Sequence, residues 1–178
     1  MKRRFLILGG ASLALAGCAS APSDPSGPTR PVTLVSAFGG QRTGTGVFRI
    51  WLTGEERRFT ARLAGRVTGK AGKRILTVVE DFAYDDGQTD RLTWVFRETG
   101  PGRWTGTRED TVGAAVVTEE NGRIRLTYTA DFRSLSGVTR LGFADLIYAR
   151  DDGVIINDGI VSRAGIPVAA VRFVIRSA

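Results

Sequence analysis

From residue 46 to the C-terminus, apolar and polar residues alternate in short runs that turn residues interrupt. The clearest run is 123–132, where every second residue from Ile124 to Phe132 is apolar or small. A period of two places alternate side chains on opposite faces of a β-strand. The pattern predicts strands at 46–52, 58–68, 74–84, 89–97, 103–109, 112–118, 123–132, 138–149, 154–163 and 167–175.

The breaks between these runs carry the sequences of tight hairpin turns, such as Asp85-Asp86-Gly87 and Asn121-Gly122. No segment shows a helical period of adequate length, although 133–137 is compatible with one short turn. A long meander of hairpins leaves open edges unless it closes on itself. We therefore expect an all-β, antiparallel, up-and-down (lipocalin-like) barrel of about 8–10 strands, with room for packed side chains or one small ligand. A two-sheet sandwich is the alternative.

The N-terminus begins with the basic residues 2–4, followed by an apolar run over 5–15. This arrangement is typical of a secretory signal peptide, and the run is shorter than the about 20 apolar residues of a membrane-spanning helix. Residues 15–18, Leu-Ala-Gly-Cys, look like a bacterial lipobox. That resemblance implies a signal peptide over 1–17, cleavage before Cys18 and lipidation of its sulfur. A buried free cysteine is the alternative.

Residues 19–31 contain four of the six prolines in the chain, together with Ser and Gly. This composition cannot bury a core, so we expect 18–31 to be the lipidated N-terminus and a flexible tether, followed by one domain at 32–178. Two or three acyl chains hold a protein stably on a membrane. We expect the protein to be exported and lipid-anchored in the bacterial envelope. Ala19, after the cysteine, resembles a signal for the outer membrane, facing the periplasm.

Composition excludes several kinds of site, because the chain has no histidine and one cysteine. With Cys18 lipidated, no Ser-His-Asp triad, Cys-His dyad or zinc site with imidazole or thiolate ligands is available. The turns 85–87 and 151–153 resemble fragments of calcium loops but lack the further oxygen ligands. We expect no metal, no cofactor and, for an exported lipoprotein, no nucleic acid.

Several motifs are similar to an uncharacterised family of bacterial lipoproteins, a domain of unknown function. The resemblance covers nearly the whole of the expected domain, and it implies a lipocalin-like barrel without implying a reaction. The motifs lie at 80–87 with Arg91 and Trp94, at 104–106, at 143–148, and at Asn157 and Gly165.

Three polar residues interrupt apolar strand faces: Glu80, Asp145 and Asn157. A buried carboxylate is costly unless it is paired or hydrogen-bonded, and we expect Glu80 to pair with Arg91 on the next strand. Such residues can orient the head group of a ligand in an apolar pocket. An internal salt bridge, or strand ends in solvent, is the structural alternative. The candidate ligand-binding residues are Glu80, Tyr84, Arg91, Trp94, Asp145 and Asn157.

These observations favour a membrane-anchored lipoprotein that binds a lipid or another hydrophobic small molecule in the cell envelope. The alternative is a structural or assembly lipoprotein that binds an envelope protein. A lipid-modifying enzyme that acts through Glu80, Asp145 or a tyrosine is the third hypothesis, and no catalytic residue is assigned. The volume and lining of the barrel interior distinguish a binder from a scaffold.

Overall fold

The computed structural model describes residues 21–134 and 137–178, which form an all-β barrel. Ten antiparallel strands follow one another up and down around the cylinder, and β11 pairs with β2 to close it. The barrel strands are β2 (Gly40–Ile50), β3 (Glu56–Thr68), β4 (Ile75–Tyr84), β5 (Thr89–Gly100), β6 (Arg103–Thr107), β7 (Ala115–Glu120), β8 (Arg123–Ser134), β9 (Gly137–Arg150), β10 (Ile155–Arg163) and β11 (Ile166–Ser177).

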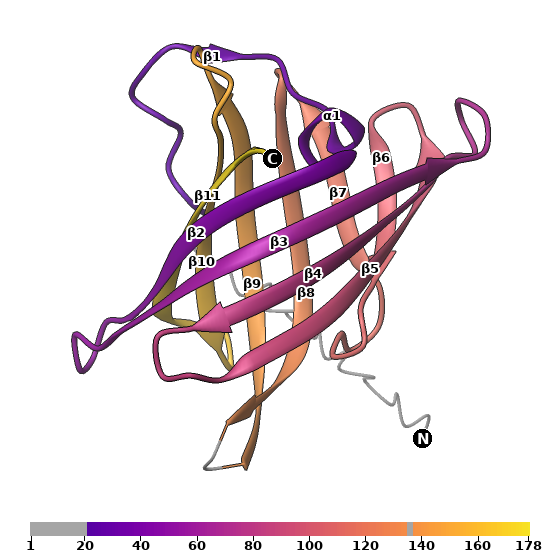
Figure 1. The fold of residues 1–178 in the computed structure, drawn as a ribbon. Coiled ribbons are helices and arrows are strands. Elements are labelled where there is room, and N and C mark those ends of the chain that lie inside the picture. The colour runs from indigo at the N-terminus through magenta and orange to yellow at the C-terminus, as the bar shows by residue number, and fades with distance from the viewer. Residues whose placement is uncertain (1–20, 135–136) are drawn as a thin grey trace, which may run out of the picture.

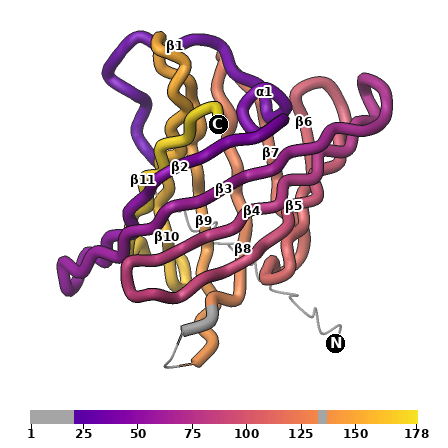
Figure 2. The backbone as a smooth tube through the Cα atoms, in the orientation of Figure 1, coloured from indigo at the N-terminus to yellow at the C-terminus, as the bar shows by residue number. Residues whose placement is uncertain are grey.

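Alternation alone is compatible with a barrel or a two-sheet sandwich. The pairing of β11 with β2 closes the sheet into a barrel, so the alternative prediction of a sandwich is wrong. Strands β2–β5 at the front of the barrel cross β8–β11 at the back steeply (Figure 1), and the tube in Figure 2 follows the same path. Every predicted strand is present, with ends that differ by a few residues. The short turn predicted within 133–137 is wrong in the described part, since 133–134 end β8 and 137 begins β9.

The largest difference is at β2, which begins at Gly40 rather than at residue 46. Glycines interrupt the alternation there, but they serve the packing inside the barrel. A Cβ at Gly44 would lie 2.4 Å from the ring of Phe173, and one at Gly46 would lie 2.2 Å from the ring of Phe59. The missing side chains therefore leave the space that two aromatic rings occupy.

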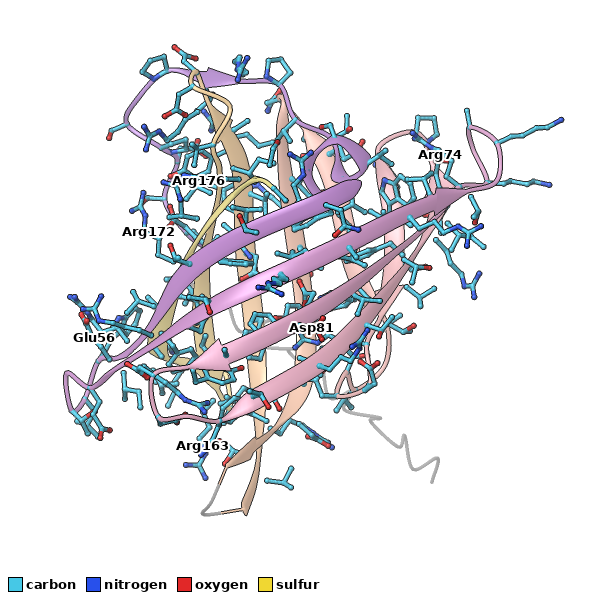
Figure 3. The ribbon with its side chains drawn as sticks, in the orientation of Figure 1. Glu56, Arg74, Asp81, Arg163, Arg172 and Arg176 are labelled. Carbon is cyan, nitrogen blue, oxygen red and sulfur yellow. The ribbon has the colours of Figure 1, made fainter. Side chains whose placement is uncertain are left out.

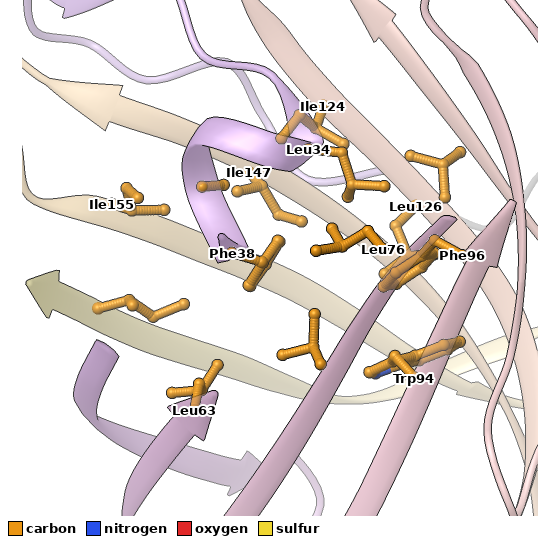
Figure 4. Packing of buried hydrophobic residues seen from close by; sticks show 14 of the residues in the cluster. Leu34, Phe38, Leu63, Leu76, Trp94, Phe96, Ile124, Leu126, Ile147 and Ile155 are labelled. Atoms are coloured by element: carbon orange, nitrogen blue, oxygen red, sulfur yellow. The ribbon is translucent and has the colours of Figure 1, made fainter. Parts of the chain in front are cut away.

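One end of the barrel is closed by a short helix, α1 (Leu34–Phe38), which sequence analysis missed. Thr33 caps it, because its side chain accepts from the Ser36 N–H while Ser36 accepts from the Thr33 N–H. The helix buries Leu34, Ala37 and Phe38, and Figure 4 shows Leu34 and Phe38 among inward side chains of the strands. No helix in the described part of the chain has the length and hydropathy of a membrane span.

Gly65 of β3 allows α1 to approach the barrel wall closely. A Cβ at this position would lie 1.7 Å from the carbonyl oxygen of Phe38, so any larger residue would displace the end of the helix. The N-terminal end of α1 is held by a hydrogen bond from the Leu34 N–H to the Glu119 carboxylate, at 2.7 Å. The helix is therefore fixed from two walls of the barrel.

The stretch predicted as a tether also contacts the barrel. Strand β1 (Thr29–Arg30) pairs with the end of β9, and the Asp24 carboxylate lies 2.7 Å from Nη1 of Arg123 at the start of β8. The predicted signal peptide and Cys18 lie outside the described residues, and the domain boundaries stay a prediction.

The apolar interior divides into two clusters. The larger one surrounds α1 and includes Leu34, Phe38, Leu76 and Ile124 (Figure 4). A smaller one lies around Leu141, Val161 and Ala169, with partly buried aromatic residues packed against it. Polar side chains enter the interior alongside these two clusters.

Candidate functional site

A cavity of about 110 Å³ lies inside the barrel. It touches Phe38 of the α1 cluster, and it reaches Phe143 and Val171, which pack against the smaller cluster. Eight further aromatic or apolar side chains of the wall are Phe59, Val78, Phe82, Trp94, Phe96, Leu126, Ile147 and Phe173. The polar lining, which we call the polar layer, consists of Glu80, Arg108, Tyr128, Asp145 and Asn157.

Arg108 is the cation of the polar layer, and most of its hydrogen-bonding capacity is already used. Its Nε and Nη2 donate to the two carboxylate oxygens of Asp110, at 2.7 and 2.9 Å. Its Nη1 lies 3.8 Å from Oε2 of Glu80. Its guanidinium carbon is 4.8 Å from the ring centre of Trp94 and 5.3 Å from that of Tyr128. The bidentate carboxylate of Asp110 therefore balances most of the charge of Arg108. Glu80 contacts only the remaining edge of the guanidinium group, at Nη1.

Glu80 and Asp145 are carboxyls withdrawn from water: Glu80 shares Arg108 with Asp110, and Asp145 has no ion pair among the described residues. Burial raises the pKa of the Glu80 carboxyl to about 7, with Arg108 opposing the rise and nearby carboxylates adding to it. Burial also raises the pKa of Asp145 to about 7, although a hydrogen bond from the Asn157 side chain opposes it. In the described chain no hydrogen-bond donor reaches Glu80, whose nearest charged partner is Arg108.

Asn157 supplies the clearest sign that the polar layer is incomplete. Its side chain donates to Asp145, and its Oδ1 is buried without a hydrogen-bond partner. Buried polar atoms are nearly always satisfied in folded proteins. Gly159 leaves space for this pair, since a Cβ there would lie 2.3 Å from Oδ1 of Asp145. The polar layer thus presents acceptors that the protein itself does not satisfy.

A model of the family described as protein of unknown function (DUF3833) matches residues 12–177. The chain belongs to the DUF3833 family. No curated protein sequence matches it. The match spans every residue of the polar layer, so the barrel and its interior belong to the part of the chain that defines DUF3833.

Four of the six predicted site residues of this DUF3833 protein line this cavity: Glu80, Trp94, Asp145 and Asn157. They come from β4, β5, β9 and β10, so residues far apart in the sequence meet inside the barrel. Whether they bind a ligand stays a prediction.

The predicted pair of Glu80 with Arg91 is wrong. In the β4–β5 register Arg91 stands opposite Asp81, whereas Glu80 stands opposite Leu92. Residues directly opposite each other share a face of the sheet, so Arg91 lies outside the barrel with Asp81, which Figure 3 labels on β4. Their side chains approach to 3.3 Å and are 71% and 49% exposed.

Tyr84 lies at the edge of the interior rather than in the cavity. It ends β4, at the end of the barrel opposite α1. Its ring contacts those of Phe59 and Phe82, with the guanidinium of Arg57 3.7 Å from its centre. Burial raises the pKa of its hydroxyl. Tyr84 is therefore a rim residue, separate from the polar layer.

Sequence analysis missed Arg108 and Tyr128. Arg108 follows β6 with the same parity as the inward Trp104, and that alternation was a usable signal. Tyr128 lies on the apolar face of the most regular strand. In the sequence pattern it counts as one more hydrophobic residue, so its polar hydroxyl group gives no signal. Its ring stacks on Phe143 with centres 4.6 Å apart.

Proposed function

We propose that this DUF3833 protein is a membrane-anchored binding barrel, which holds a small molecule with an apolar body and a polar group in the polar layer. The observation that carries the proposal is the cavity itself. It has an aromatic wall and contains Glu80, Asp145 and the unpartnered Oδ1 of Asn157. An apolar pocket with a few convergent polar groups is the usual form of a small-molecule site.

The volume of the cavity limits the size of the ligand that it can hold. Pockets for drug-sized molecules occupy roughly 300–1,000 Å³, and a cavity of about 150 Å³ binds benzene. At about 110 Å³, this interior fits a small molecule or one end of a longer one. A complete acyl chain would require core side chains to move. We therefore propose a ligand smaller than the lipid that the sequence led us to expect.

Binding is tested by native mass spectrometry of the processed protein, extracted gently from its own cells. We expect a bound small molecule that is released on denaturation. Val78→Met fills the cavity from β4 and should remove this mass. The control is Val79→Met, since Val79 faces outward on the same strand. Folded protein that repeatedly carries nothing, in both the unmodified and the control form, contradicts the proposal.

The anchor rests on the signal peptide pattern and the lipobox at Cys18. We expect radiolabelled palmitate to appear on the protein in cells. Cys18→Ser should abolish the label and release the protein from sedimenting membranes. A variant that sediments as firmly as the unmodified protein would show that the lipid is not the anchor.

A scaffold that binds an envelope protein is the second candidate, and the solid packing around α1 favours it. It predicts that Val78→Met leaves cellular function unchanged. Crosslinking in cells should then capture one defined partner, through residues on the outer surface of the barrel.

A further inference from the structure

We infer that the group held in the polar layer is a primary ammonium on a short apolar stem. This inference rests on the proposed function and names the chemical class of the ligand. Three properties of the polar layer support it: the balance of charge, the balance of hydrogen-bond donors and acceptors, and the aromatic wall.

The charge balance favours a cation. The ionisable groups around the cavity are the carboxyls of Glu80, Asp145 and Asp110, the hydroxyl of Tyr128 and the guanidinium of Arg108. Asp110 binds Arg108 in a bidentate pair, so Glu80 has only a share of this cation at 3.8 Å, and Asp145 has no ion pair among the described residues. An anionic ligand would add to their repulsion, whereas a cation completes two ion pairs.

The hydrogen-bond balance favours N–H donors. Glu80 receives no hydrogen bond from the described residues, Asp145 receives one from Asn157, and Asn157 Oδ1 receives none. These are acceptors, at least when the carboxyls are ionised, and an unpartnered buried acceptor costs about 1–3 kcal/mol. A primary ammonium has three donors and no acceptor. A quaternary ammonium supplies charge but no donor.

The aromatic wall suits the rest of such a ligand. The rings of Phe59, Phe82 and Phe173 lie within 6.4 Å of one another, and the ring of Phe143 stacks on that of Tyr128. Ring faces attract a cation that has lost its water, and ring edges and aliphatic groups pack against an apolar stem. The volume of about 110 Å³ limits that stem to a few carbon atoms.

The experiment compares four probes of similar size on the full-length processed protein in detergent: n-butylamine, n-butanol, butyrate and tetramethylammonium. Affinity is measured by calorimetry at pH 8 and again at pH 6. We expect n-butylamine to bind at least about tenfold more tightly than the other three. Its affinity should rise from pH 6 to pH 8, because the pKa of both Glu80 and Asp145 is about 7 and ionisation completes the site.

Glu80→Gln and Asp145→Asn should each weaken n-butylamine binding about tenfold or more and flatten its pH dependence. Asp81→Asn removes a carboxylate from the outer face of the same strand and should leave the affinity unchanged. Thermal unfolding checks that each variant is folded. If one of the interior variants does not fold, the other variant and the pH dependence of the unmodified protein still decide the question.

Each other outcome has a definite meaning. Equal or tighter binding of n-butanol or butyrate overturns the inference and leaves the proposed function standing, as does a co-purified ligand without a primary amine. Equal binding of tetramethylammonium overturns the requirement for N–H donors. If no probe binds and the extracted protein carries no ligand, both the inference and the proposed function fail.

Discussion

Two inward-facing glutamates on neighbouring strands, Glu98 near the end of β5 and the more deeply buried Glu80 of β4, behave in opposite ways. The Glu98 side chain accepts hydrogen bonds from the Arg74 guanidinium and from the N–H groups of Gly72 and Arg74. These bonds, with that of Arg74 foremost, lower the pKa of Glu98 to about 2. Burial raises the pKa of Glu80 to about 7.

Hydrogen-bond donors thus lower the pKa of Glu98 at the end of its strand, whereas deep burial without a donor raises the pKa of Glu80. At the α1 end the carboxyls hold the structure together, as Glu119 does when it accepts from the Leu34 N–H and from Nε1 of Trp104. In the polar layer Glu80 receives no hydrogen bond from the described residues and Asp145 receives one, so the cost of burying these carboxyls is only partly offset. A local conflict of this kind is what a functional site produces.

The largest effect should come from Arg108→Met, which removes the cation that buried Glu80 shares with partly exposed Asp110. Breaking a buried ion pair from one side costs roughly 3–5 kcal/mol. We expect a loss of that size in the free energy of unfolding, measured in urea at pH 8. The control Arg91→Met breaks the exposed pair with Asp81 and should cost less than about 1 kcal/mol. Equal losses from both variants would contradict the contrast between the two faces of the sheet.

Leu34→Ala should reduce the stability of the α1 end without altering the polar layer. Leu34 is fully buried, and truncation of such a leucine costs roughly 2–5 kcal/mol. We expect a lower midpoint in urea and unchanged n-butylamine affinity for the folded protein. A parallel loss of affinity would mean that the two regions are not separable.

The smallest effect of a single side chain concerns pH. A carboxyl with a raised pKa binds more protons in the folded state, so its contribution to stability falls as the pH rises from about 4 to about 7. Glu80 and Asp145 should each contribute roughly 3 kcal/mol to the decrease over this window. Glu80→Gln should remove about half of the total decrease. Glu98 acts in the opposite sense, since its contribution is lost only as the pH falls towards about 2.

Denaturation curves at pH 5 and pH 8 measure this effect. The comparison is between the unmodified protein, Glu80→Gln and the outward control Asp81→Asn, which should follow the unmodified protein. A stability that rises between these pH values in the unmodified protein, and equally in Glu80→Gln, is incompatible with carboxyls whose pKa is raised by burial.

The sequence predicts the strands well because alternation is a local property, and it places Glu80, Asp145 and Asn157 correctly on inward faces. It does not predict which residues stand opposite each other, because register depends on turn geometry and closure. The prediction that Arg91 lies inside the barrel is wrong for this reason.

The helix α1 and Arg108 escape prediction for different reasons. The helix α1 is too short for a helical period, and its capping residues Thr33 and Ser36 are common in loops. Arg108 escapes prediction because a charged residue at the end of a strand is usually in solvent. Only the closed barrel shows that this end of β6 meets β4 and β8 across the interior.

The ion pair of Asp24 with Arg123 bears on how the barrel would lie on a membrane if Cys18 carries the proposed lipid. Six positions separate Asp24 from Cys18, and a fully extended chain of that length reaches about 20 Å. A lipid at Cys18 would keep the start of β8, and with it the sealed helical cap, near the bilayer. The rim that carries Tyr84 would then point to the aqueous compartment. A ligand would then enter the barrel from the aqueous compartment, as a water-soluble amine can, and not by lateral diffusion from the bilayer.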